Sequence, residues 1–158
     1  MSTTPTIHAS AVLAGAGAVL IRGPAGSGKS RLALNLIQAA SNGQLIFARL
    51  VADDRVHLEA AHNRLIARPP AALAGLLEVR GLGIQRLPYE PMAVVSWVVD
   101  LDVVEPMRMP DDKAAHAIVA GVRIRRLAVA PGCDSFPMVL VAVTSRSLPP
   151  PYPPPASG

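Results

Sequence analysis

Several residue types are scarce in this chain of 158 residues, and each shortage excludes a class of protein. Cys133 is the single cysteine, which excludes a disulfide framework and a cysteine-rich zinc site. Aromatic residues make up 3% of the sequence, too few for the stacking platforms that bind single-stranded nucleic acid. No apolar run reaches the roughly 18 residues of a membrane span, and the N-terminus lacks the pattern of a signal peptide. We therefore expect a cytoplasmic protein that binds neither membranes nor nucleic acid.

Lysine is also rare, since Lys29 and Lys113 are the only two among 15 basic residues. The net charge of +4 therefore comes mostly from arginine, which binds phosphates and carboxylates through two parallel hydrogen bonds. The arginines are scattered, apart from a cluster at Arg123, Arg125 and Arg126. Such a cluster is typical of a solvated strand face, and a docking patch for an acidic partner is the alternative.

Apolar residues make up 51% of the sequence, which is enough for one core, so we expect a single domain over 1–148. The predicted elements are a β-hairpin over 12–21, a helix over 29–40, strands over 46–51, 56–60, 64–67, 92–99 and 122–128, a short helix over 71–76, a charged loop over 105–113 and a last helix from 134 to about 147. Proline lacks an amide hydrogen and cannot continue a ladder or a helix. The proline-rich tail over 149–158 is therefore predicted to be disordered or extended.

Residues 23–30 read GPAGSGKS, which matches the phosphate-binding pattern G-x-x-x-x-G-K-S at every position. They follow a predicted strand and open a predicted helix, which is the context that this P-loop motif requires. Its glycines let backbone amides turn toward an anion, and the helix N-terminus adds partial positive charge. The predicted ATP-binding residues are Gly23, Pro24, Ala25, Gly26, Ser27, Gly28, Lys29, which reaches the outer phosphates, and Ser30, whose hydroxyl binds Mg²⁺.

A P-loop enzyme also needs a carboxylate near the metal and a group that aligns the nucleophile. Asp100 ends the apolar run VVSWVVD, as the acid of an ordinary Walker B strand does. Asp53 and Asp54 end the shorter run LIFARLVA, closer to the P-loop in sequence. Both assignments place an acid at a strand end, where an open α/β sheet presents its ligand site. Periodicity alone does not choose between them.

Four segments in order resemble the catalytic domain of the HPr kinase/phosphorylase family. They are His8-Ala9-Ser10, GPAGSGKS, LVADDRV at 50–56 and LEVRGLGI at 77–84, and later elements around Arg108 and Ala128 to Cys133 are similar to the family more weakly. The resemblance implies an α/β, P-loop kinase-like domain with a mixed central sheet flanked by helices. It also implies transfer of the γ-phosphoryl group of ATP to a serine of the phosphocarrier protein HPr, with Mg²⁺, by a homo-hexamer.

The resemblance also implies roles for the acid pair and its neighbours. Asp54 would accept the serine proton in the kinase reaction and return a proton in the reverse reaction, because a serine hydroxyl is a poor nucleophile until a carboxylate takes its proton. Asp53 would assist in the metal or substrate network. His8, Lys29 and Arg108 match catalytic positions of the family.

The segment LEVRGLGI carries the remaining site residues that the resemblance implies. Glu78 would join Ser30 around Mg²⁺. Arg80 would reach phosphate or pair with an acid, and Gly81 would allow close approach of the backbone.

Two departures from the family pattern limit what the resemblance implies. The chain begins almost directly at His8, so we expect the N-terminal domain of many members to be missing. The family's proline-glycine turn for dephosphorylation reads AVAPGC here, with Ala130 and Cys133 where arginines would stand. Loss of two guanidinium groups weakens binding of inorganic phosphate, so weak or absent phosphorylase activity is expected.

Two other classes of function stay open at this point. A nucleotide-binding regulatory module would keep the P-loop and signal through a partner without transferring phosphate. A small-molecule P-loop kinase would need a lid, for which the arginine-bearing segments around Arg108 and over 123–126 are the candidates.

Overall fold

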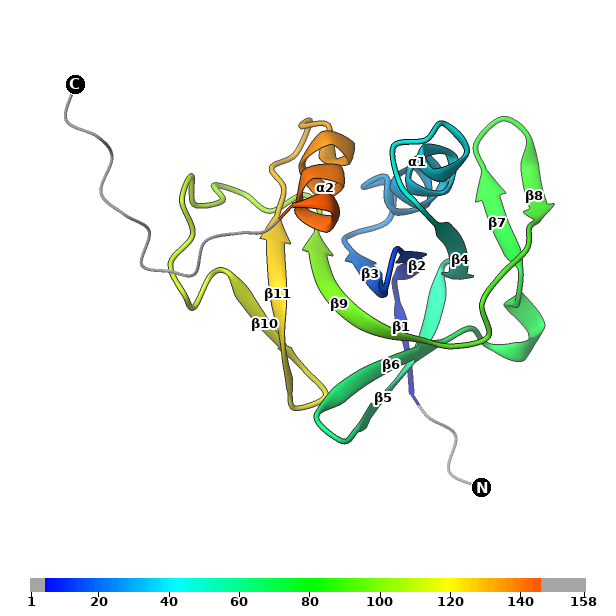
Figure 1. Cartoon of the computed structure of the whole chain (residues 1–158). Helices are drawn as coiled ribbons and strands as arrows, with labels where there is room; N and C mark the ends of the chain where they lie inside the picture. Colours follow the sequence, from blue (N-terminus) through cyan, green and yellow to red (C-terminus); the bar gives the residue numbers. More distant parts are fainter. Residues whose placement is uncertain (1–4, 146–158) are drawn as a thin grey trace.

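The computed structural model describes residues 5–145 of the chain (Figure 1). Its strands are β1 (Thr6–His8), β2 (Ser10–Ala14), β3 (Gly17–Arg22), β4 (Ala48–Ala52), β5 (Arg55–Ala61), β6 (Arg64–Arg68), β7 (Leu76–Val79), β8 (Gly83–Arg86), β9 (Ala93–Asp100), β10 (His116–Val119) and β11 (Val122–Ala128). Its helices are α1 (Lys29–Ser41) and α2 (Ser135–Thr144), with a 3₁₀ turn at Ala71–Leu73. Most of the predicted elements are therefore present.

The strands β4, β2, β3, β9 and β11 lie side by side in that order in the central sheet. β3 pairs with β9 and β9 with β11 in parallel, whereas β2 is antiparallel to both β3 and β4. The carboxyl ends of β3, β4, β9 and β11 therefore meet the amino end of β2 at one edge of the sheet. Open α/β sheets bind their ligands at such an edge.

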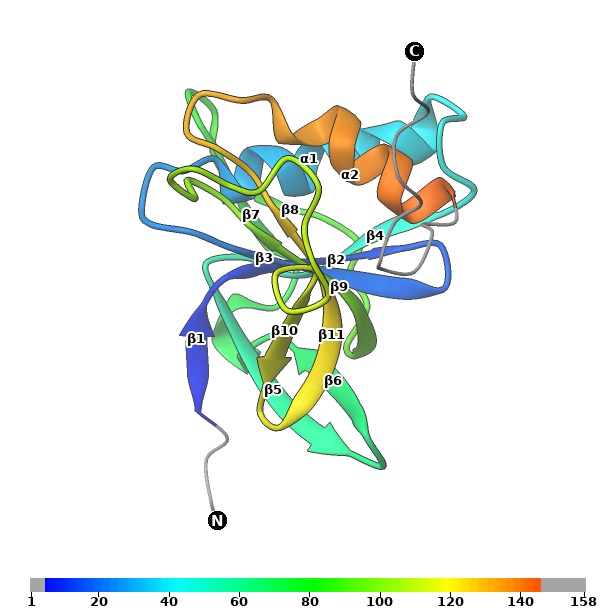
Figure 2. The same ribbon diagram turned by 90° about the vertical axis from the view of Figure 1, so that its left-hand side faces the viewer.

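The sheet is curled, because β9 also pairs at its start with a strand of a second layer. Ala93 and Val94 face Ala67 and Ile66 of β6, and β6 continues through β5 to β1. In Figures 1 and 2 the helices α1 and α2 cover one face of the central sheet, and the β5–β6 hairpin lies across the other. The predicted α/β class with a mixed sheet is thus confirmed.

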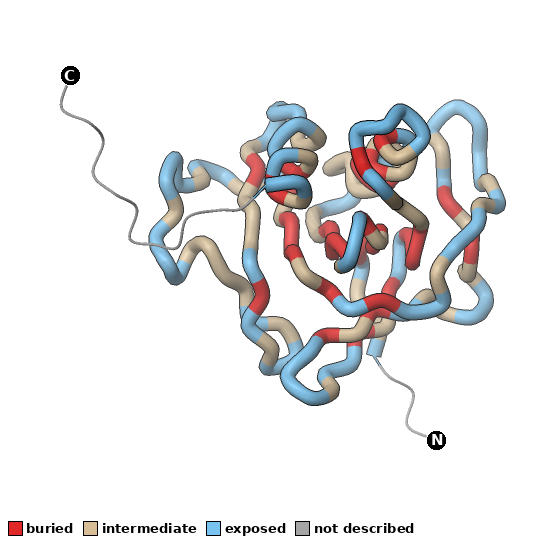
Figure 3. Tube along the Cα trace, viewed as in Figure 1, coloured by how far each residue is buried: buried red, intermediate tan, exposed pale blue. Residues whose placement is uncertain are grey.

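Side chains alternate between two apolar cores along the central strands, as the twofold period of a strand requires. In β3, Val19 and Ile21 pack with α1, whereas Ala18 and Leu20 pack with the β5–β6 layer. All four are fully buried. Figure 3 shows the buried segments concentrated along the central strands and the inner face of the helices. The central sheet is therefore packed on both faces.

The structure differs from the predicted elements in several places. The helix predicted over 71–76 is a single 3₁₀ turn, because Gly75 has a φ of 77° and turns the chain into β7. The short strands β1, β7, β8 and β10 were not predicted, and α2 ends at Thr144 rather than near residue 147. The tail over 149–158 and the domain boundary at 148 lie outside the described residues. In the described part of the chain, no helix is long and apolar enough to cross a membrane.

Candidate functional site

The P-loop leaves the carboxyl end of β3 and leads directly into α1. Gly26 and Gly28 have φ values of 80° and 97°, in the left-handed region that glycine adopts without strain. Gly28 is also the N-cap of α1 and provides no capping side chain. The first amides of α1 therefore point toward the loop, where the helix N-terminus favours an anion.

Two side chains of the loop fit a phosphate ligand. Lys29 Nζ donates hydrogen bonds to the carbonyl oxygens of Gly23 (2.8 Å) and Pro24 (3.1 Å), so the ammonium group folds back over the loop. Ser27 Oγ is buried and has no hydrogen-bond partner among the described residues. A buried hydroxyl without a partner is costly, and a phosphate oxygen would satisfy it.

Asp53 follows β4 directly and connects three elements around the P-loop. Its Oδ1 accepts hydrogen bonds from Ser10 Oγ (2.7 Å) and Ser30 Oγ (2.8 Å), and its Oδ2 accepts one from the backbone amide of Glu78 (3.2 Å). All three donors are neutral groups. A carboxylate beside the P-loop serine suits Mg²⁺, which prefers oxygen ligands. Asp53 and Ser30 therefore fit the metal that the family resemblance implies.

Asp54 is exposed and lies at the tip of a tight turn. The Arg55 amide donates to the Asp53 carbonyl oxygen (2.8 Å), which closes a three-residue γ-turn with Asp54 at its centre. The φ of Asp54 is 69°, a conformation that non-glycine residues rarely adopt. The neighbouring acids thus differ in environment: Asp53 is buried against the P-loop helix and Asp54 is open to solvent.

His8 lies across the β1–β5 pairing from Arg55. Its Nε2 is 3.2 Å from Arg55 Nη2, and both side chains are exposed. The structure therefore brings His8 to the residue that follows Asp54, on the outer side of the acid pair.

The β7–β8 hairpin carries the predicted residues of LEVRGLGI and lies beside α1 (Figure 1). Glu78 contributes its backbone amide to Asp53, and its side chain is exposed. Arg80 is exposed and Gly81, with a φ of 85°, is in the hairpin turn. The hairpin is thus tied to the P-loop through Asp53, while the metal-binding role of the Glu78 carboxylate stays a prediction.

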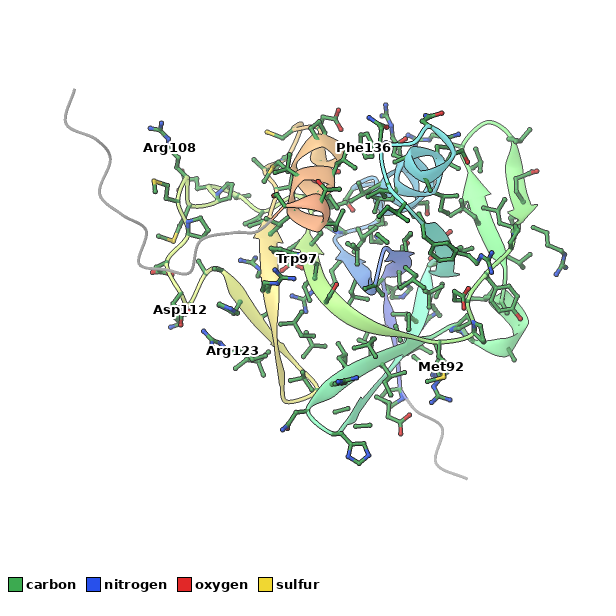
Figure 4. The ribbon with its side chains drawn as sticks, viewed as in Figure 1. Met92, Trp97, Arg108, Asp112, Arg123 and Phe136 are labelled. Carbon is green, nitrogen blue, oxygen red and sulfur yellow. The ribbon has the colours of Figure 1, made fainter. Side chains whose placement is uncertain are left out.

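Arg108 is on the loop between β9 and β10, and Figure 4 shows it pointing outward. With Arg126 and Met138 it lines a surface hollow of about 220 Å³. None of the three hydrogen bonds to the Asp53 carboxylate described above comes from Arg108. Its predicted catalytic role stays a prediction.

Asp100 ends β9 at the same edge of the sheet, where it serves structure. Arg22 donates to Oδ1 from Nε (2.7 Å) and to Oδ2 from Nη2 (2.9 Å), and Arg126 Nε donates to Oδ2 (2.6 Å). Burial by itself would raise the pKa of Asp100, but the hydrogen bonds and charges of the two arginines outweigh it and lower the pKa below 3.8. The negative charge of Asp100 is thereby balanced by its two arginine partners.

The arginine cluster on β11 does not form one patch. Arg123 and Arg125 are exposed, as expected for a solvated strand face. Arg123 pairs with Asp112 (2.5 Å), and the Arg125 guanidinium stacks 4.3 Å from the centre of the Trp97 ring. Figure 4 shows Arg123 of β11 next to Asp112, which lies in the turn before β10. Arg126 differs, because Asp100 draws it inward.

Sequence reasoning assigned no role to Ser10. It is fully buried at the amino end of β2, and its hydroxyl is the closest donor to Asp53. The available signal was a serine placed between alanines at the start of an apolar strand, within the segment His8-Ala9-Ser10.

A mixed α/β domain with a glycine-rich loop and a neighbouring buried acid is typical of P-loop kinases. Residues 1–88 match the family model HPr Serine kinase C-terminal domain. The chain therefore belongs to this family, as the sequence resemblance indicated.

Individual relatives agree with the family model. The HPr kinase/phosphorylase of Clostridium tetani is 44% identical over 70 residues, which are 44% of this chain and 21% of the relative. The HPr kinase/phosphorylase of Clostridium beijerinckii is 46% identical over 66 residues, covering 42% of this chain and 20% of the relative. The chain thus matches about a fifth of the length of these curated relatives.

A solved structure matches much more of the chain. The Hpr(Ser) kinase/phosphatase from Coxiella burnetii superposes with a TM-score of 0.67 at 26% identity, over 88% of this chain and 93% of that one. The likeness therefore extends beyond residue 88.

Proposed function

We propose that this chain is an ATP- and Mg²⁺-dependent protein kinase that phosphorylates a serine of an HPr-type phosphocarrier protein. The observation that carries the proposal is the difference in environment between Asp53 and Asp54. Asp53 is buried and bonded to Ser30 of the P-loop, whereas Asp54 is exposed at the next position. Asp53 would thus face the Mg²⁺ of a bound nucleotide, and Asp54 would face the acceptor protein.

The P-loop would hold the phosphates of ATP. Backbone amides around Gly28 and the ammonium group of Lys29 would bind the outer phosphates, with Ser27 Oγ as an additional donor. Ser30 and Asp53 would hold Mg²⁺, with Glu78 as a further proposed ligand. Bound Mg²⁺ would supply neutralisation of charge on the transferring phosphoryl group.

Asp54 would act as the general base. Its exposed carboxylate would accept the proton of the acceptor serine as that oxygen attacks the γ-phosphorus atom, and ADP would leave with the bridging oxygen. His8 and Arg108 are proposed catalytic residues by their match to family positions, and Arg80 with Gly81 would support the acceptor.

Two features of the wider assignment are also proposals. The exposed Cys133 and the half-buried Ala130 replace arginines in the family's dephosphorylation turn, which supports weak or absent phosphorylase activity. A homo-hexamer is proposed from the family resemblance.

The test is incubation of the purified protein with labelled ATP, Mg²⁺ and HPr, followed by identification of phosphoserine. Asp54→Asn should reduce transfer by roughly 10²- to 10⁴-fold, because a general base contributes about that much, while ATP binding is retained. Asp102→Asn is the matched control, since Asp102 is also an exposed aspartate with a positive φ, of 57°. Its transfer rate should equal that of the wild-type protein.

Other outcomes would favour the rival classes. Nucleotide binding without any phosphoserine on HPr, with partner binding kept in Asp54→Asn, would indicate a regulatory module. Inhibition of transfer by nucleosides or small alcohols would indicate a small-molecule kinase.

A further inference from the structure

We propose that Ser10 is a positioning residue that holds Asp53 against Ser30, and that the bend between β1 and β2 sets the orientation of both acids. The inference deepens the proposed function and rests on it in one respect, namely that Asp53 faces the Mg²⁺ of a bound nucleotide. It concerns a side chain for which neither the motifs nor the family resemblance provides a role.

Burial provides the first argument. Within residues 5–145, Ser10 (0% exposed) and Asp53 (5% exposed) are the only polar or charged residues that are buried. Their apolar neighbours Ala9 and Ala11 are fully buried as well. Burial of a carboxylate is unfavourable unless it is hydrogen-bonded. The fold therefore contains one buried polar pair, and that pair adjoins the P-loop.

Hydrogen-bond geometry provides the second argument. Asp53 Oδ1 accepts from Ser10 on β2 and from Ser30 on α1, while Oδ2 accepts from the Glu78 amide of β7. Donors on three separate elements fix the plane of the carboxylate. Without the Ser10 hydroxyl, Oδ1 would keep only the bond to Ser30, a residue that must also bind the metal. Ser10 thus supplies the contact that does not depend on the nucleotide.

The backbone of the same bend provides the third argument. The Ala9 amide donates to the carbonyl oxygen of Asp54 (3.2 Å), one residue before Ser10 binds Asp53. These two contacts connect the consecutive residues Ala9 and Ser10 to both acids of the γ-turn. The bend therefore determines that Asp53 faces inward and Asp54 faces solvent, which is the arrangement that the proposed transfer requires.

The experiment measures affinity for a fluorescent ATP analogue in EDTA and in Mg²⁺, so it does not depend on phosphoryl transfer. Ser10→Ala should leave the affinity in EDTA within about twofold and reduce the Mg²⁺-dependent gain by roughly tenfold or more, as expected for a hydrogen bond to a charged group. In the Asp53→Asn background, Ser10→Ala should have no further effect on that gain, because the two residues act as a unit.

Two further variants keep the test decisive. Ser10→Cys keeps the size of the side chain with a weaker donor, and it should lose several-fold of the gain even if Ser10→Ala does not fold. Ser96→Ala is the matched control, because Ser96 is a half-buried serine of β9 that bonds to Ala18 at the opposite end of β3. It should retain the full Mg²⁺-dependent gain.

The inference is overturned if Ser10→Ala keeps the wild-type gain, even with a lower melting temperature, since Ser10 would then be purely structural. It is also overturned if affinity falls equally in EDTA and Mg²⁺. A selective loss of the gain in a protein that does not phosphorylate HPr would support the role of Ser10 and reject the proposed kinase activity.

Discussion

Asp53 and Asp100 end neighbouring parts of the same sheet edge, yet their surroundings are opposite. Asp53 is bonded to two hydroxyl groups and one backbone amide, all neutral. Asp100 is bonded to the guanidinium groups of Arg22 and Arg126. None of these three donors to Asp53 is cationic, whereas the negative charge of Asp100 is balanced by two guanidinium groups. A position at a strand end therefore does not make an acid a metal ligand, and the charge of its partners decides its role.

The two acids also connect different elements of the fold. Asp100 and its arginines join β3, β9 and β11 directly behind the P-loop, since Arg22 precedes Gly23. Asp53 connects β2, α1 and β7 through its three hydrogen bonds. We infer that the ion pairs of Asp100 hold the strands together. The neutral donors around Asp53 leave its carboxylate available to a cation.

The largest expected difference concerns nucleotide binding. Asp53→Asn should abolish most of the Mg²⁺-dependent gain in ATP affinity and lower phosphoryl transfer on the order of 100-fold, because it removes the uncompensated charge beside Ser30. Asp100→Asn should leave the Mg²⁺-dependent gain unchanged. Isothermal titration with ATP, with and without Mg²⁺, measures both. The comparison fails if Asp100→Asn loses the gain and Asp53→Asn retains it.

The next largest effect concerns Asp100 and the stability of the folded protein. Asp100→Asn should lower the free energy of unfolding by about 2 kcal/mol, since it leaves two partly buried guanidinium groups without a counter-charge. The side chains of Asp100, Arg126 and Arg22 are 15%, 23% and 33% exposed, so the loss stays below that of a fully buried pair.

Urea denaturation measures this loss, and the ion pair between Arg123 and Asp112 supplies the control. Both of its side chains are more than half exposed. Asp112→Asn should therefore change the free energy of unfolding by less than about 0.5 kcal/mol. Equal losses in the two variants would contradict a special role for the Asp100 cluster.

The smallest effect is a pH dependence. The pKa of Asp100 is lowered below 3.8 in the folded protein and returns to its ordinary value in the unfolded chain. A group with a lowered folded-state pKa contributes stability above the unfolded pKa, and this contribution is lost as the pH falls through the folded pKa. Below about pH 4, unfolding free energy should thus decline more steeply for the wild-type protein than for Asp100→Asn. Parallel curves from urea titrations at stepped pH would contradict the assignment.

Local sequence patterns were sufficient to predict much of the fold and the phosphate-binding motif of the site. The hairpin of β2 and β3, the helix α1 and the strand β9 depend on apolar periodicity over contiguous residues, and all three were predicted. The start of α2 was also predicted, and Asp134 caps it by accepting a hydrogen bond from the Phe136 amide (3.2 Å). The 3₁₀ turn before Gly75 was missed because helix propensity in PPAALA is overridden by a single glycine with positive φ.

The sequence by itself identified the P-loop motif, because its eight residues are contiguous, and it indicated the family through the order of four motifs. The tertiary structure alone decided the roles of the acids. Ser10 is 43 positions from Asp53, and Arg22 is 78 positions from Asp100. Electrostatic environment is set by partners that only the folded sheet brings together, so no local pattern could show which carboxylate is bonded to arginines and which to neutral groups.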